Sequence, residues 1–194
     1  MHHGQSGRGK MDMIDDVKKI YLKKSIDLRG CSCKLLSPEI EKSYLKGYEQ
    51  KELFVSMSQE NTVRGLHFQS FPYGQKKVIF VIKGSITGVI LDLRENSKTF
   101  LKYETVELNE DSDHGIYVPP YCAWGFKAKK ESILIYSIDG IYDREYDDGI
   151  LWKSIDYDWG TNNPLISDRD AALPMLDEYL ERKNKNYEMP NLSK

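Results

Sequence analysis

The stretch "KKVIFVIKGSITGVILDL", residues 76–93, places two apolar runs on either side of a short turn at 83–85. Each run is apolar at consecutive positions and rich in Val and Ile, which favours strands whose two faces both contact protein. Strands of this kind occur in the middle of a β-sandwich or small barrel. The stretch therefore predicts an all-β fold, either a sandwich or a jelly roll.

Short apolar runs of the same kind recur every 10 to 15 residues or so, between about 50 and 140. Turn residues separate them at 94–98, 109–115, 119–121 and 127–131. Helical patterns are confined to the two ends: one begins at Ser37 and Pro38, and the other at Ser167. We expect short helices that flank the sheets.

The 194 residues fit one domain, and the net charge of −2 gives no basic surface for nucleic acid or an anionic membrane. No apolar run approaches the roughly 18 residues that span a bilayer, and the N-terminus lacks the apolar stretch of a signal peptide. The sequence therefore predicts a cytoplasmic protein. Residues 1–10 are rich in Gly, His and Ser, and we expect them to be disordered or an expression remnant.

Three cysteines are present, Cys31, Cys33 and Cys122. An odd number without a secretion signal argues against a disulfide framework. Cys31 and Cys33 have too few Cys or His neighbours in sequence for a zinc site. We expect free thiols that are buried or half-buried.

"TVRGLHFQ", residues 62–69, contains His67, one of two histidines outside the N-terminal ten residues; the other, His114, lies in a polar turn and is expected to be solvated. A metal-binding cupin needs about three or four His and carboxylate ligands, usually with an H-x-H pair on one strand. Gly65 and Gln69 occupy the positions two before and two after His67. The sequence therefore predicts no metal site.

In a strand, His67 and Gln69 share one face, while Leu66 and Phe68 share the other and fill the core. Arg64 lies three positions from His67, so in a regular strand the two side chains point to opposite faces. Gly65 between them tolerates a bulge that would redirect one of the side chains. Two interpretations of His67 remain open at this point: it bonds a backbone carbonyl, or it serves as a base.

Other polar residues form a set with His67 that has a chemical use. Lys77 begins the next apolar strand, Tyr136 lies within "ILIYSI", and "DRD" at 168–170 supplies carboxylates. A base, a cation, a phenol and a carboxylate can remove a proton beside a ketone, stabilise the enolate and return a proton to the opposite face. Each residue also has a structural interpretation, because Lys at a strand start is usually solvated and Tyr in a strand usually packs.

The chain resembles the dTDP-4-dehydrorhamnose 3,5-epimerase family, which are metal-free cupins acting on nucleotide 4-keto-6-deoxy sugars. The resemblance covers residues 27–170, about three quarters of the chain, through "DLRG", "SQENTVRGLHFQSFPYGQKKVIFVIKGSITGVILDLRENSKTF", "YVPPYCAWGF", "YSIDGIYDREYDDGILW" and "NPLISDRD". It implies a cupin-type jelly roll at 11–170. Residues 171–194 lie beyond the resemblance, and their pattern predicts a C-terminal helical extension and tail. The resemblance also implies an isomerase without a cofactor.

The resemblance implies a role for each matching residue. His67 would be the general base, oriented by Asp170, and Tyr136 the general acid on the other face of the sugar. Lys77 would stabilise the enolate, and Arg29 would reach the diphosphate from the neighbouring subunit of a homodimer. The implied substrate-binding residues are Arg64, Arg29, Gln69, Tyr142, Trp124 and Arg169.

Three departures from the family's pattern bear on specificity. Trp124 stands where the family has histidine, Lys34 where it has an acid, and Glu52, Leu53 and Phe54 where a stretch helps to read thymidine. The predicted substrate is therefore a nucleoside-diphosphate 4-keto-6-deoxy sugar with an unassigned base (dTDP, CDP, GDP or UDP), inverted at C3, C5 or both. The alternatives are a sugar-nucleotide 3,4-ketoisomerase and a non-catalytic sugar-nucleotide-binding cupin.

Overall fold

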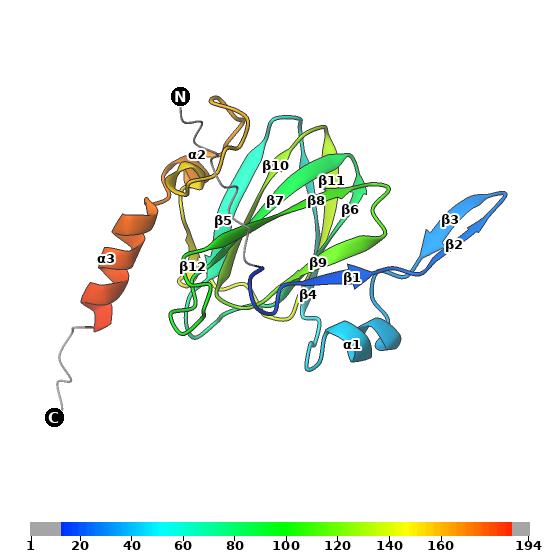
Figure 1. Cartoon of the computed structure of the whole chain (residues 1–194), viewed down its shortest axis with the longest axis horizontal. Coiled ribbons are helices and arrows are strands. Elements are labelled where there is room, and N and C mark those ends of the chain that lie inside the picture. The colour runs from blue at the N-terminus through cyan, green and yellow to red at the C-terminus, as the bar shows by residue number, and fades with distance from the viewer. Residues whose placement is uncertain (1–12, 188–194) are drawn as a thin grey trace, which may run out of the picture.

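The computed structural model describes residues 13–187, so the prediction for residues 1–10 lies outside the described residues. Two five-stranded sheets pack face to face (Figure 1). All strand pairs within them are antiparallel. The first sheet contains β1 (Lys18–Tyr21), β9 (His114–Val118), β6 (Lys77–Lys83), β11 (Ser132–Ile138) and β4 (Glu52–Ser58), in that order. The second contains β12 (Asp147–Gly149), β5 (Val63–Gln69), β10 (Cys122–Ala128), β7 (Ser85–Asp92) and β8 (Tyr103–Asn109).

The stretch at 76–93 forms β6 and β7, and these consecutive strands lie in different sheets. Gly84 joins them with a φ of +85°, and a Cβ there would lie 2.2 Å from the carbonyl oxygen of Glu131. Only glycine satisfies both conditions without strain. The predicted turn therefore carries the chain from one sheet to the other.

Apolar clusters on both faces of each sheet explain why β6 and β7 are apolar at consecutive positions. Ile79 and Ile90 belong to the cluster between the sheets. Phe80 faces away from it, into a cluster under α1 (Pro38–Tyr44). Leu91 faces a third cluster, which includes Tyr179 of α3 (Leu176–Tyr187). The fold therefore has helices outside both sheets, as in the predicted jelly roll with short flanking helices.

The helix starts agree with the sequence. Ser37 caps α1 by accepting a hydrogen bond from the Ile40 N–H at 3.3 Å, and Pro38 is the first helical residue. Ser167 caps α2 (Asp168–Ala171) in the same way. The predicted C-terminal helix is divided in two, because Pro174 falls between α2 and α3.

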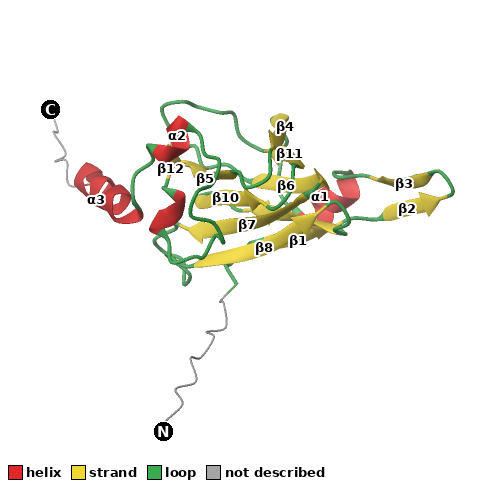
Figure 2. Cartoon of the chain, turned by 90° about the horizontal axis from the view of Figure 1, so that it is seen from above, coloured by secondary structure: helices red, strands yellow, loops and turns green. Residues whose placement is uncertain are grey.

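Three N-terminal strands were not predicted: β1, β2 (Lys24–Asp27) and β3 (Gly30–Cys33). The β2–β3 hairpin projects away from the sheets (Figures 1 and 2). Cys31 and Cys33 are exposed on it, so their predicted burial is wrong, whereas Cys122 is buried. Among the described residues, the two hairpin strands pair only with each other, so no sheet packs over these thiols. Among the described helices, none has the length and apolarity needed to cross a bilayer.

Candidate active site

A bulge in β5 directs two polar side chains into one cavity. His67 pairs with Trp124 of β10, but Phe126 pairs with Arg64, so β5 contains one extra residue between the two pairs. Gly65 makes this possible with a φ of +100°, and a Cβ there would lie 2.5 Å from the carbonyl oxygen of Trp124. The predicted bulge is therefore present, and both Arg64 and His67 line the cavity.

Residues from both sheets line this cavity, whose volume is about 290 Å³. Leu66 and Phe68 are buried, as predicted, in the cluster outside the second sheet. The cavity brings together most of the predicted site residues, which are His67, Tyr136, Lys77, Arg64, Gln69, Trp124, Tyr142 and Arg169. Glu52, Phe54, Ser56, Gln75 and Asp147 are among its other lining residues.

His67 is bonded to a carboxylate rather than to a backbone carbonyl. Its Nε2 lies 2.7 Å from Oδ1 of Asp170, whose Oδ2 accepts the N–H of Gly65 at 3.0 Å. Burial raises the pKa of Asp170, but the hydrogen bonds from His67 and Gly65 and the charge of nearby Arg169 outweigh it, so this pKa lies below its usual value. Asp170 therefore stays ionised and fixes the imidazole, leaving Nδ1 as the ring nitrogen available to a substrate.

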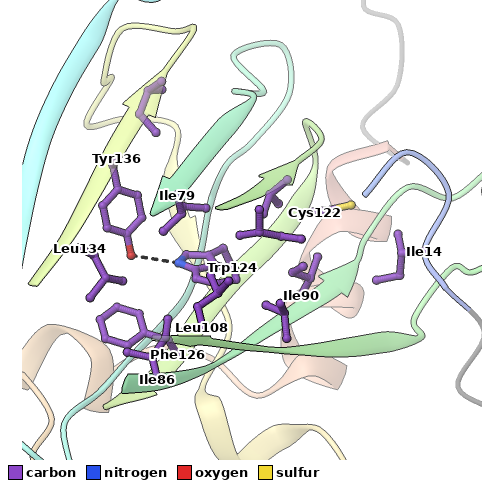
Figure 3. Close-up of a cluster of buried hydrophobic side chains, with 14 of the residues drawn as sticks. Ile14, Ile79, Ile86, Ile90, Leu108, Cys122, Trp124, Phe126, Leu134 and Tyr136 are labelled. Carbon is purple, nitrogen blue, oxygen red and sulfur yellow. Dashed lines mark hydrogen bonds between the residues drawn. The ribbon is translucent and has the colours of Figure 1, made fainter. Parts of the chain in front are cut away.

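Tyr136 comes from the opposite sheet. Its hydroxyl accepts a hydrogen bond from Nε1 of Trp124 at 3.0 Å (Figure 3), and its ring stacks on Phe54 with centroids 4.7 Å apart. Burial raises the pKa of Tyr136 well above its usual value, although the Trp124 N–H and the charge of Arg64 oppose the rise. The phenol therefore holds its proton at neutral pH and can act as a donor.

Lys77 is buried rather than solvated. Its Nζ donates to the carbonyl oxygen of His67 at 3.1 Å, and its side chain lines the cavity. Burial lowers the pKa of Lys77 to about 8, with Asp147 and Cys122 acting in the opposite direction. A cation and a hydrogen-bonded imidazole therefore line the same cavity.

A second set of contacts orders one edge of the cavity. Oδ2 of Asp147 accepts the hydroxyl of Tyr142 at 3.0 Å and an N–H of Arg169 at 2.6 Å. Glu52 accepts the backbone N–H of Tyr142 at 2.8 Å, and Gln69 accepts that of Asp143 at 3.2 Å. Sequence reasoning missed Asp147, although it lies within the quoted stretch 136–152; its position on the short edge strand β12, paired with Gln69, could not be foreseen.

Two predicted or discounted residues lie elsewhere. Arg29 is on the exposed β2–β3 hairpin, forms an ion pair with Asp27 at 2.6 Å, and does not line the cavity of its own chain. His114 is not in a solvated turn as expected: it opens β9, its Nδ1 contacts Asp113 at 2.7 Å, and its Nε2 is buried. Within residues 13–187, no group of three or more His, Cys, Asp or Glu side chains is arranged to hold a metal ion.

Residues 12–178 match the family model described as dTDP-4-dehydrorhamnose 3,5-epimerase. The chain belongs to this family. The predicted family is thereby confirmed, and the match extends beyond the expected domain end at 170.

Relatives and solved structures agree with this assignment. The dTDP-4-dehydrorhamnose 3,5-epimerase of Shigella flexneri is 36% identical over 118 residues, 59% of this chain and 65% of that protein. The enzyme of the same name from Sinorhizobium fredii is 31% identical over 85% of this chain and 87% of its own. The crystal structure of the Bacillus anthracis enzyme, with TDP and pyrophosphate bound, has a TM-score of 0.80 at 31% identity, over 86% of this chain and 99% of that one.

These similarities confirm two predictions for this chain, the cupin-type jelly roll and the isomerase class of enzyme. The similar proteins also carry the activity that the sequence predicts, the epimerisation of a 4-keto-6-deoxy sugar nucleotide. The NovW protein of Streptomyces spheroides, described as a 4-keto-6-deoxy sugar epimerase, has a TM-score of 0.82 at 26% identity.

Proposed function

We propose that this chain inverts C3, C5 or both in a nucleoside-diphosphate 4-keto-6-deoxy sugar. The main support for this proposal is that His67 and Tyr136 line one cavity from opposite sheets. A sugar ring held between them has an imidazole on one face and a phenol on the other. This is the arrangement that inversion at carbon requires, because the proton must leave one face and return to the other.

In the proposed reaction, His67 takes the proton from the carbon beside the C4 ketone. The C–H electron pair becomes the enolate double bond, and the carbonyl electrons move to the C4 oxygen. Tyr136 then gives its O–H proton to the opposite face of that carbon, and the C4 carbonyl re-forms. Solvent returns a proton to the tyrosinate, and the His67 imidazolium releases its proton to solvent. The ketone itself acidifies the C–H, so the residues described here suffice without a redox cofactor.

Two further residues support this chemistry. The Lys77 ammonium is in the cavity and would stabilise the negative C4 oxygen. Asp170 would hold the His67 imidazole in the tautomer that leaves Nδ1 unprotonated. We propose catalytic roles for His67, Tyr136 and Lys77 and a positioning role for Asp170.

The remaining cavity residues would bind the substrate. Arg64 offers a bidentate guanidinium to the diphosphate or sugar, and Tyr142 offers an exposed ring to the nucleotide base. Gln69 and Arg169 lie at the same edge as Tyr142, while Trp124 lies beside His67. The carboxylate of Glu52 in this cavity distinguishes the chain from its family's pattern, and we propose that thymine is not clearly preferred over other bases.

We also propose that the chain works as a homodimer in which Arg29 of a second copy completes the site. Ile26 and Leu28 are exposed on the projecting hairpin. Leu53, Val55 and Met57 are exposed on β4, an edge strand of the first sheet. Exposed apolar side chains on an edge strand indicate a protein partner.

We further propose a cytoplasmic location for this chain, which its free cysteines favour.

Hydrogen exchange in deuterated water tests the function. The purified protein is incubated with dTDP-, CDP-, GDP- and UDP-linked 4-keto-6-deoxy sugars, and deuterium at C3 and C5 is followed by NMR. We expect exchange and inversion with at least one nucleotide, and a loss of about 100-fold to 10,000-fold in His67→Asn. His114→Asn is the matched control, because His114 lies outside the cavity. No exchange with any of these sugars by the folded protein would overturn the proposal.

A further inference from the structure

A hydrogen bond between Trp124 and Tyr136 connects the two sheets inside the cavity. Trp124 projects from β10 of the second sheet and Tyr136 from β11 of the first, and Nε1 of the indole lies 3.0 Å from the phenol oxygen (Figure 3). The two side chains are 4% and 6% exposed, so water competes little for this bond. Both residues line the cavity that also holds His67.

The direction of this bond follows from the chemistry of the two groups. An indole N–H can only donate, so the phenol oxygen must accept. The O–H proton of Tyr136 is therefore not used in the bond, and among the described residues none accepts a hydrogen bond from it. The free proton is left for whatever occupies the cavity.

We propose that Trp124 is a positioning residue that aims the Tyr136 proton at the substrate and holds the oxygen after the proton has left. When the proton moves to carbon, the phenol oxygen becomes negative. A hydrogen bond to a charged acceptor is stronger than one to a neutral acceptor, so the indole N–H stabilises the transition state more than the ground state. The inference rests on the proposed epimerase function and assigns Trp124 a role in only one of its two proton transfers.

The surroundings hold the indole in this position. A Cβ at Gly88 of β7 would lie 2.3 Å from Cη2 of Trp124 and 3.0 Å from Cγ1 of Val106. Any larger residue at this position would displace the indole. On the other side, Phe54 stacks on the Tyr136 ring at an interplanar angle of 4°. Gly88 and Phe54 therefore fix the two partners of the bond without touching its atoms.

The position of Trp124 relative to His67 indicates that the indole acts on only one of the two proton transfers. Trp124 pairs directly with His67 in the β5–β10 register, so both side chains leave their sheet on the same face. The imidazole is held by Asp170 and not by the indole. Loss of the indole N–H should therefore impair proton delivery by Tyr136 and leave proton removal by His67 working.

In deuterated water, proton removal by His67 and proton delivery by Tyr136 can be measured separately. When His67 removes the proton and returns a deuteron to the same face, unconverted substrate becomes labelled; when Tyr136 delivers the deuteron, labelled product is inverted. For Trp124→Phe we expect inversion to fall about 10-fold, as for the loss of one hydrogen bond, while total proton removal changes less than about 3-fold. The ratio of labelled substrate to inverted product should therefore rise.

Trp159→Phe is the matched control. Nε1 of Trp159 donates to the carbonyl oxygen of Trp152 at 2.9 Å, and Trp159 is buried in the cluster outside the second sheet, away from the cavity. This variant loses the same kind of bond, so it should lower the melting temperature without changing the labelling ratio. Gly88→Ala keeps every cavity side chain but displaces the indole, and it should raise the ratio as Trp124→Phe does.

Each outcome either supports or overturns the proposed role of Trp124. A folded Trp124→Phe protein with the wild-type ratio would overturn the proposal, and so would one that loses exchange and inversion equally, because Trp124 would then act on binding or on the base. If Trp124→Phe does not fold, the ratio in Gly88→Ala decides instead. A wild-type protein that neither exchanges nor inverts any of the four sugars would instead defeat the proposed function itself.

Discussion

The ammonium group of Lys77 donates a hydrogen bond to the backbone carbonyl of His67, with 3.1 Å between Nζ and the oxygen. β5 and β6 lie in different sheets, so this bond joins the proposed enolate-stabilising cation to the strand of the base. Burial lowers the pKa of Lys77 to about 8, so the cation is present at neutral pH and lost in mildly alkaline solution. The charge of Lys77 therefore changes with pH in the range where activity can be measured.

The first prediction concerns that charge. Because the pKa of Lys77 is lowered to about 8 by burial, kcat/KM should fall as pH rises through about 8, where the ammonium loses its proton. Lys77→Met should be about 100-fold or more slower at neutral pH and should lack this alkaline fall. Lys76→Met is the control, because Lys76 pairs with Asp139 outside the cavity. An unchanged alkaline fall in Lys77→Met would assign it to another group.

The second prediction concerns the carboxylate behind the base. An asparagine amide at position 170 can donate to Nε2 of His67, which would place the imidazole proton on Nδ1 and remove the lone pair that takes the substrate proton. Asp170→Asn should therefore lower kcat about 100-fold or more, with little change in KM. Asp168→Asn on the same helix is exposed and should keep the wild-type kcat. Near-wild-type kcat in Asp170→Asn would show that the base needs no carboxylate.

The third prediction concerns the bulge. Gly65→Ala combines a φ of +100° with a Cβ only 2.5 Å from a backbone oxygen, so it should lower the free energy of unfolding by about 3 kcal/mol and redirect Arg64 and His67. Gly47→Ala separates the two causes, because Gly47 has a φ of +70° with nothing within 4 Å of its Cβ. That variant should lose only about 1 kcal/mol. Equal losses in urea unfolding would mean that close packing at Gly65 contributes nothing.

The sequence predicts those parts of the molecule in which local pattern and burial agree. β7 and the first four residues of β6 are buried on both faces, in agreement with the apolar pattern of the stretch at 76–93. The β2–β3 hairpin escaped prediction because it is polar and exposed, and it has no core face whose pattern could reveal it. The bulge at Gly65 was foreseeable because glycine marks it.

Contacts between distant strands could not be read from the sequence. The bond from Trp124 to Tyr136 depends on how the two sheets pack, and the contacts of Asp147 depend on a three-residue strand pairing with β5. The resemblance supplied residue identities at these positions but not the geometry between them. Tertiary structure determines that geometry.

The last prediction concerns Arg29 and the proposed dimer. Arg29 lies on the projecting hairpin and does not line the cavity of its own chain, so it should act in the cavity of a second copy. His67→Asn and Arg29→Ala should each be nearly inactive alone. In a mixed dimer, the Arg29→Ala chain keeps its base, and the His67→Asn chain lends its intact Arg29 to that cavity, which completes one site.

Co-refolding the two variants in equal amounts should therefore restore activity to about a quarter of the sites, since random pairing makes half of the dimers mixed and each mixed dimer has one complete site. An arginine acting within its own chain gives a different result, because neither cavity of the mixed dimer then has both residues. The control pairs Arg29→Ala with an Arg29→Ala, His67→Asn double variant, which has no arginine to lend and should restore nothing. Activity in the first mixture and not in the second is the result expected when the hairpin of one subunit completes the site of the other.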